Sequence, residues 1–164
     1  MATKNSFKFQ FIPLFISILT TQAVGIASAY FTLPEVEGWY RTIAKPPITP
    51  PDWAFAPVWT AIYLLTGISA YIVWERRDGS LAYKTVSIVY ALQLLINFLW
   101  AFIFFGMHQI FGGMIDTVLL WLAVLLNMIC FYKFNRVAGW LLLPYLLWVS
   151  FSVVLSVWLL QLNQ

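Results

Sequence analysis

Five long stretches of almost uncharged, apolar residues constrain this chain more than any other feature. Each stretch is about 20 residues long, the length that a helix needs to cross the hydrocarbon core of a bilayer, and together they hold one charged side chain, Asp116. The ten-residue alternation of a membrane β-barrel is absent. We therefore predict an all-α integral membrane protein, a single bundle of five transmembrane helices over residues 1–164, with spans at about 9–31, 53–74, 85–105, 112–132 and 140–160.

Composition excludes several other classes of protein. Hydrophobic residues make up 62% of the chain and charged residues 9%, whereas about a quarter of a soluble domain is charged. A soluble enzyme and a disordered chain are both excluded. One cysteine rules out a disulfide framework and a cysteine-based zinc site, so we expect no metal. The net charge of +3 gives no reason to expect nucleic acid as a partner.

Basic residues indicate the orientation in the membrane. Arg41 and Lys45 are the two basic residues between the first and second spans. Under the positive-inside rule, the N-terminus should be cytoplasmic and the C-terminus outside a bacterial cell membrane. The other seven all fall on the N-terminal side: Lys4, Lys8, Arg76, Arg77, Lys84, Lys133 and Arg136.

The segment 34–52 is a proline-rich loop between the first two spans. Paired prolines favour extended backbone, and a loop this long is either functional or disordered. We expect an ordered lid, with Asp52 as the N-cap of the second span. The alternative is an interfacial aromatic belt with a stiff linker. The expected lid residues are Trp39, Lys45, Pro46, Pro47, Pro50, Pro51 and Trp53.

Polar and aromatic side chains recur at helical spacing inside the spans. Gln93, Asn97 and Trp100 share one face of the third span. Amides in a bilayer should point into the bundle, either to bond neighbouring helices or to contact a ligand. Aromatic walls with a few polar groups suit a large, planar, apolar ligand. The corresponding candidates in the second and fifth spans are Trp59, Tyr63, Trp148 and Ser152.

Two further polar residues lie outside the second, third and fifth spans. Asp116 is the acid inside a predicted span, so it serves either as a structural anchor near the helix start or in ligand or proton binding. His108 follows the third span with no carboxylate near it in sequence. We expect its ring to be solvated and not to bind haem.

Several motifs resemble those of the TspO/MBR family, the tryptophan-rich sensory and translocator proteins. Their order along the chain is Trp39-Tyr40, Lys45-Pro-Pro-x-x-Pro-Pro-x-Trp53, Pro57-Val-Trp-Thr-x-x-Tyr63, Ala91-Leu-Gln-Leu-x-x-Asn97-x-x-Trp100 and Leu143-Pro-Tyr-Leu-x-Trp148. The resemblance implies a five-helix fold, a homodimer, and a pocket among spans one, two and five closed by the proline-rich loop. Trp59 and Trp148 would form its walls and Asn97 a polar contact.

The same resemblance implies the ligand class. It suggests porphyrins such as protoporphyrin IX, or isoquinoline-carboxamide-type compounds, bound by a receptor or transporter in tetrapyrrole sensing or homeostasis, with no cofactor required. The sequence shows no nucleophile–base or acid–base pair, so we predict no catalytic residues. The alternatives are a tryptophan-dependent, light-driven porphyrin-degrading enzyme and a small-drug transporter. The uncharged C-terminal tail lacks the Tyr and Arg of the cholesterol-recognition pattern in animal members, which favours a bacterial member.

Overall fold

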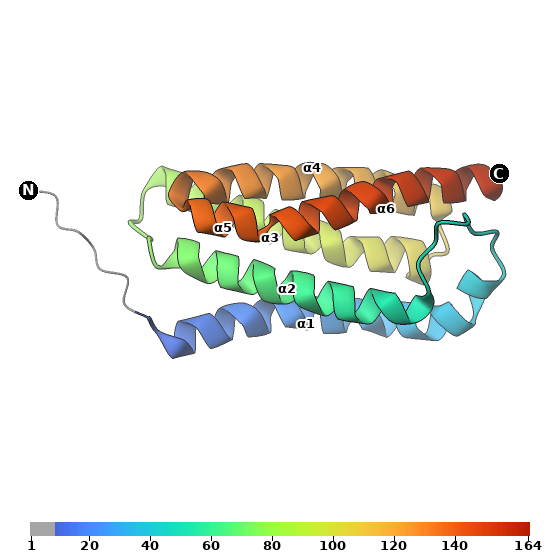
Figure 1. The fold of residues 1–164 in the computed structure, drawn as a ribbon, viewed down its shortest axis with the longest axis horizontal. Coiled ribbons are helices and arrows are strands. Elements are labelled where there is room, and N and C mark those ends of the chain that lie inside the picture. Colours follow the sequence, from blue (N-terminus) through green and yellow to red (C-terminus); the bar gives the residue numbers. More distant parts are fainter. Residues whose placement is uncertain (1–8) are drawn as a thin grey trace, which may run out of the picture.

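The computed structural model describes residues 9–164, and every regular element in that range is helical. Five stretches are long and apolar enough to cross a membrane, so the predicted fold class is confirmed. Figure 1 shows the helices running alongside one another. The elements are α1 (Phe11–Glu37), the 3₁₀ turn η1 (Trp39–Arg41), α2 (Asp52–Trp74), α3 (Leu81–Ala101), the π-helical turn η2 (Phe102–Gly106), α4 (Ile110–Phe134), α5 (Arg136–Leu141) and α6 (Leu143–Leu162).

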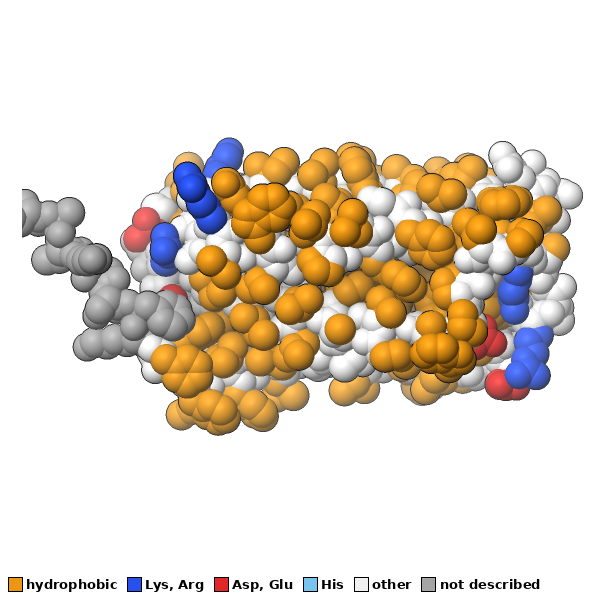
Figure 2. All heavy atoms as spheres, in the orientation of Figure 1, with side chains coloured by type: hydrophobic (Ala, Val, Ile, Leu, Met, Phe, Trp, Pro, Cys, Tyr) orange, Lys and Arg blue, Asp and Glu red, His pale blue; other side chains and the backbone are white. Residues whose placement is uncertain are grey.

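The two ends of the bundle differ from its middle. The loop between α1 and α2 lies at the same end as the C-terminus, and the α2–α3 turn lies at the other end (Figure 1). Figure 2 shows apolar side chains covering the long middle, with charged side chains gathered toward both ends. This distribution is the one expected of a protein whose flank faces hydrocarbon. Lys4 and Lys8, on which the predicted orientation partly depends, lie outside the described residues.

Two predicted boundaries around the loop are wrong. The first helix continues through Pro34 and ends at Glu37, so the connection covers residues 38–51 and not 34–52. Asp52 is not the N-cap of α2, because extended Pro51 holds that position and Asp52 already belongs to the first helical turn. There its carboxylate faces the positive end of the helix dipole.

The third and fifth spans contain interruptions that the apolar pattern does not reveal. The third ends in a π-helical turn, in which the Met107 N–H donates to the Phe102 carbonyl at 2.9 Å. Single π-helical turns occur frequently at functional sites. The fifth span starts at Arg136 and divides into α5 and α6 at Leu142, just before Pro144, whose ring cannot continue a hydrogen-bonded helix.

Close contact between α1 and α2 depends on small and hydroxyl side chains. A Cβ at Gly67 would lie 2.7 Å from the Ile18 Cα atom, so only glycine allows this approach. The Thr21 hydroxyl, fully buried, donates to the Tyr63 carbonyl at 2.9 Å. Helices in lipid associate through such small residues and interhelical hydrogen bonds.

Candidate functional site: an aromatic pocket beneath the loop

A pocket of about 400 Å³ lies inside the bundle at the loop end. This volume is typical of small-molecule sites, which are mostly apolar with a few polar groups. The first, second and fifth spans line the pocket as expected, and α3, η2 and α4 also contribute to it. Of the seven residues predicted to contact a ligand, six line it: Trp59, Tyr63, Asn97, Trp100, Trp148 and Ser152.

Gln93, the seventh, does not line the pocket. Its amide Nε2 donates to the Tyr145 hydroxyl at 3.2 Å, and its Oε1 accepts from Asn127 Nδ2 at 2.8 Å. Gln93 is fully buried, so its amide links α3 with α4 and α6. The interpretation of Gln93 as an interhelical hydrogen-bonding residue therefore fits its position.

Asn97 belongs to the same network but faces the pocket. The Tyr63 hydroxyl donates to Asn97 Oδ1, and Asn97 Nδ2 donates to the Tyr145 hydroxyl. Three helices therefore hold the amide in one orientation. A fixed amide in an apolar wall is a polar group that can orient a ligand.

The tryptophans that line the pocket are held in different ways. Trp100 stacks on Phe104 with ring centroids 5.2 Å apart, and its indole N–H donates to the Thr117 hydroxyl at 2.8 Å. The Trp148 indole nitrogen is buried and has no hydrogen-bond partner among the described residues. A buried indole N–H normally has an acceptor, so this donor is unsatisfied, and a ligand acceptor would reach it only if the side chains that enclose it move.

The loop meets the pocket through two residues that were not among the predicted lid residues. Tyr40 and Thr49 line the pocket, and the Lys45 ammonium lies 4.0 Å from the centre of the Tyr40 ring. Burial, and secondarily the negative charge of Asp52, raises the pKa of the Tyr40 phenol to about 12. Tyr40 therefore presents an uncharged hydroxyl at neutral pH.

A pair of hydrogen bonds fastens the loop to the end of α6. Asn163 Oδ1 accepts from the Ala44 N–H at 3.0 Å, and Asn163 Nδ2 donates to the Ala44 carbonyl at 2.8 Å. We call this pair the Asn163 latch. It joins residues 119 positions apart in the chain, so no local sequence pattern could have predicted it.

The seven residues predicted to form the lid do not lie on the pocket wall. Pro46 is buried within the loop, Pro47 is exposed, and Trp53 is 76% exposed and points outward. Trp39 packs on Phe104 with ring centroids 5.4 Å apart.

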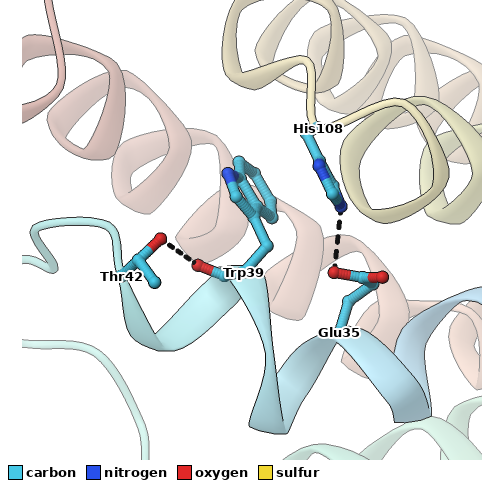
Figure 3. A network of polar contacts seen from close by, with 4 residues as sticks. All are labelled: Glu35, Trp39, Thr42 and His108. Carbon is cyan, nitrogen blue, oxygen red and sulfur yellow. Dashed lines mark hydrogen bonds and ion pairs between the residues drawn. The ribbon is translucent and has the colours of Figure 1, made fainter.

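His108 is exposed, as expected from the sequence, but a carboxylate lies beside it, which the sequence-based expectation did not include. Its ring stacks on Trp39 at a centroid distance of 4.6 Å, and its Nε2 lies 2.9 Å from Glu35 Oε2 (Figure 3). The contact ties the end of α1 to the turn after η2. Because Glu35 lies 73 positions earlier, the neighbouring sequence could not predict the pair.

Asp116 lies in the second turn of α4 and is buried. Its Oδ2 atom has no hydrogen-bond partner among the described residues. The side chain does not line the pocket, although that of Thr117 does. Both interpretations of Asp116, as an anchor and as a ligand or proton site, therefore stay predictions.

The first span was expected to line the pocket, but none of its individual residues was among those predicted to contact a ligand. A Cβ at Gly25 would lie 2.6 Å from the Tyr63 ring, so the glycine makes room for that tyrosine in the pocket wall. Spacing of small residues along the first span is the signal that could have indicated this face. The α1 residues in the wall are Gln22, Gly25, Ile26, Ser28, Ala29, Thr32, Leu33 and Val36.

Five membrane spans around an internal pocket walled by tryptophan define a small integral membrane protein built to enclose an apolar space. The TspO/MBR family profile matches residues 17–161, and the chain belongs to this family. It is 40% identical to the tryptophan-rich protein TspO of Archaeoglobus fulgidus, over 93% of this chain and 97% of that protein. It is 31% identical to the tryptophan-rich sensory protein of Cereibacter sphaeroides (92% and 91% covered) and 34% identical to the translocator protein of Homo sapiens (72% and 70% covered).

Proposed function

We propose that this protein binds porphyrin-like tetrapyrroles and related planar hydrophobic molecules in the pocket beneath the loop, and acts as a receptor or transporter. The observation that carries the proposal is the combination of Trp59, Trp100 and Trp148 around one apolar space, with an indole N–H that has no partner in the described part of the chain. Flat aromatic walls favour a flat ligand, and the free donor favours one with a carbonyl or carboxylate acceptor. Family membership supports this class of ligand.

Titration of the purified protein with protoporphyrin IX tests the proposal. Bound porphyrin should quench tryptophan fluorescence in a saturable way at one equivalent of ligand. Quenching no greater than in a control with N-acetyltryptophanamide at the same tryptophan and detergent concentrations would contradict it.

Illumination of the complex separates binding from degradation. A receptor or transporter leaves the porphyrin absorbance unchanged relative to a protein-free sample, whereas a porphyrin-degrading enzyme lowers it and forms new products. Among the described residues, no group of three or more His, Cys, Asp or Glu side chains is placed to hold a metal ion.

We also propose a bacterial cell-membrane location with the N-terminus cytoplasmic, together with a homodimer. The unequal basic residues support the orientation, and family membership supports the dimer. Light scattering of the protein–detergent complex, with the detergent mass subtracted, measures the oligomeric state. A protein mass equal to one chain would contradict the homodimer.

A further inference from the structure

A second cavity, of about 320 Å³, lies at the other end of the bundle and shares no lining residue with the aromatic pocket. We call it the α1–α3 crevice. Its walls come from α1, α2 and α3, and Phe131 of α4 completes its floor. The volume falls at the lower end of the range for small-molecule sites.

The crevice opens sideways, toward the surrounding hydrocarbon. Near the loop end, α1 and α3 are held together by Phe31, whose ring packs against Phe98 and Phe102 at 6.0 and 5.3 Å. Toward the other end the crevice separates the two helices. On its rims, Ile16 of α1 is 56% exposed and Ser87 of α3 is also exposed, whereas its floor residues are buried.

The lining suits a hydrocarbon chain. The Ser17 hydroxyl donates to the Gly67 carbonyl at 2.7 Å, and the Ser87 hydroxyl donates to the Tyr83 carbonyl at 3.0 Å. These two donors are used within the protein, and most of the other wall atoms are aliphatic or aromatic. From Tyr83 to Tyr90 the crevice follows α3 for about 10 Å at 1.5 Å per residue, along the direction in which acyl chains run.

Positive charge stands at the end of the crevice that is nearest the membrane surface. The Arg77 guanidinium lies 3.6 Å from the centre of the Trp74 ring, and Trp74 lines the crevice. Lys84 is exposed and lies one helical turn before Ser87 on the same face of α3. Five basic residues but only two acidic ones, Glu75 and Asp78, lie at this end among the described residues.

We propose that the α1–α3 crevice binds one acyl chain of an anionic phospholipid, whose phosphate is held by Arg77 and Lys84. The lateral opening admits a chain from the bilayer without its leaving the hydrocarbon. The basic residues select a negative headgroup, because each Lys or Arg near the surface attracts anionic lipid. The crevice would then act as a lipid site distinct from the aromatic pocket.

Native mass spectrometry of the purified protein tests this site with phosphatidylglycerol and phosphatidylcholine of identical acyl chains. The protein should retain one phosphatidylglycerol in preference to phosphatidylcholine. The double variant Arg77→Gln/Lys84→Gln should reduce that preference by roughly 10- to 30-fold. Lys133→Gln/Arg136→Gln removes the same charge at the same end, away from the crevice lining, and should preserve it.

A third variant tests the crevice itself. Ser87→Phe places a large side chain at the exposed mouth, where the fold has room for it, so helical circular dichroism should be unchanged while retention of both lipids falls. Equal losses in the two charge variants would overturn the proposal in favour of general surface attraction. Unchanged retention in Ser87→Phe, or a sterol that displaces both phospholipids from the crevice, would also overturn it.

Discussion

Trp148 is the side chain on which the proposed site most depends. It packs against Phe55 across the gap between α6 and α2, with ring centroids 6.0 Å apart, while its indole N–H has no partner within residues 9–164. Trp59 stands on the α2 side and stacks on Tyr63 at 5.6 Å. The two indoles thus border the same space from two helices.

Loss of either indole should weaken porphyrin binding. We expect Trp59→Leu and Trp148→Leu each to reduce affinity by about 5- to 150-fold, since stacking on an aromatic ring contributes roughly 1–3 kcal/mol per contact. Fluorescence or absorbance titration measures the change. Trp158→Leu is the matched control, because Trp158 is on the same helix but does not line the pocket. An equal loss in Trp158→Leu would show that the pocket is misplaced.

Between elements, two kinds of contact shape the site. Gly67 brings α1 against α2 and so positions the α1 half of the pocket wall. The Asn163 latch holds the loop against the end of α6, where Tyr40 and Thr49 reach the pocket. One contact is a close packing of backbones and the other a pair of hydrogen bonds, and they should respond differently to mutation.

Substitution of Gly67 should destabilise the bundle. Alanine normally favours a helix over glycine by about 1 kcal/mol, but at this position the new methyl would lie 2.7 Å from backbone of α1. Overpacking of this kind costs about 1–3 kcal/mol, so Gly67→Ala should lower the thermal midpoint in detergent. In Gly106→Ala the methyl meets side-chain atoms at 3.2 Å or more, and its midpoint should fall less. A higher midpoint for Gly67→Ala would contradict the close packing.

Removal of the Asn163 latch should accelerate ligand release. Asn163→Ala loses both hydrogen bonds to Ala44, which frees the loop and raises the entropy lost when the loop closes over a ligand. Two lost bonds at about 1 kcal/mol each allow the dissociation rate to rise by up to roughly 30-fold. Stopped-flow displacement of bound porphyrin measures this rate. Gln161→Ala, exposed on the same helix end, should release ligand at the original rate. Unchanged release from Asn163→Ala would mean that the loop serves only as a linker.

Replacement of the loop prolines tests the same lid by another route. Alanine at all four of the paired prolines 46, 47, 50 and 51 gives the unbound loop more conformations to lose. Affinity should fall mainly through a faster off-rate, while the helical circular dichroism signal is preserved. Equal dissociation rates for this variant and the unmodified protein would rule out a preorganised lid.

Taken as a whole, the molecule has one end rich in basic residues and another that carries the loop and both latch partners. In a Cys130→Ser background, a cysteine at the exposed Ile48 should react with an impermeant maleimide on intact cells, and a cysteine at Asp78 should not. The reason is the excess of basic residues at the Asp78 end, which favours the cytoplasm. The reverse labelling pattern would overturn the orientation.

Hydropathy and residue type were enough to predict the five spans, because a bilayer leaves a chain few alternatives to apolar helices. Helical spacing and the family motifs also identified six of the pocket residues, since polar side chains inside a span find partners within the protein. Helix ends were less predictable: Pro34 reads as a helix terminator, yet α1 continues for one more turn. Pro34 removes one N–H donor, the one that would have bonded the carbonyl four residues earlier, and α1 ends three residues later.

Contacts between distant segments could be found only in three dimensions. Glu35 with His108, Ala44 with Asn163, and Gly25 with Tyr63 are each brought together by the packing of helices, and nothing local in either partner specifies the other. Gln93 and Asn97 show the same limit, because identical chemistry one turn apart on one face leads to different positions. One amide faces the pocket and the other bonds Asn127 and Tyr145, since rotation and depth of each helix depend on neighbours that the local sequence does not contain.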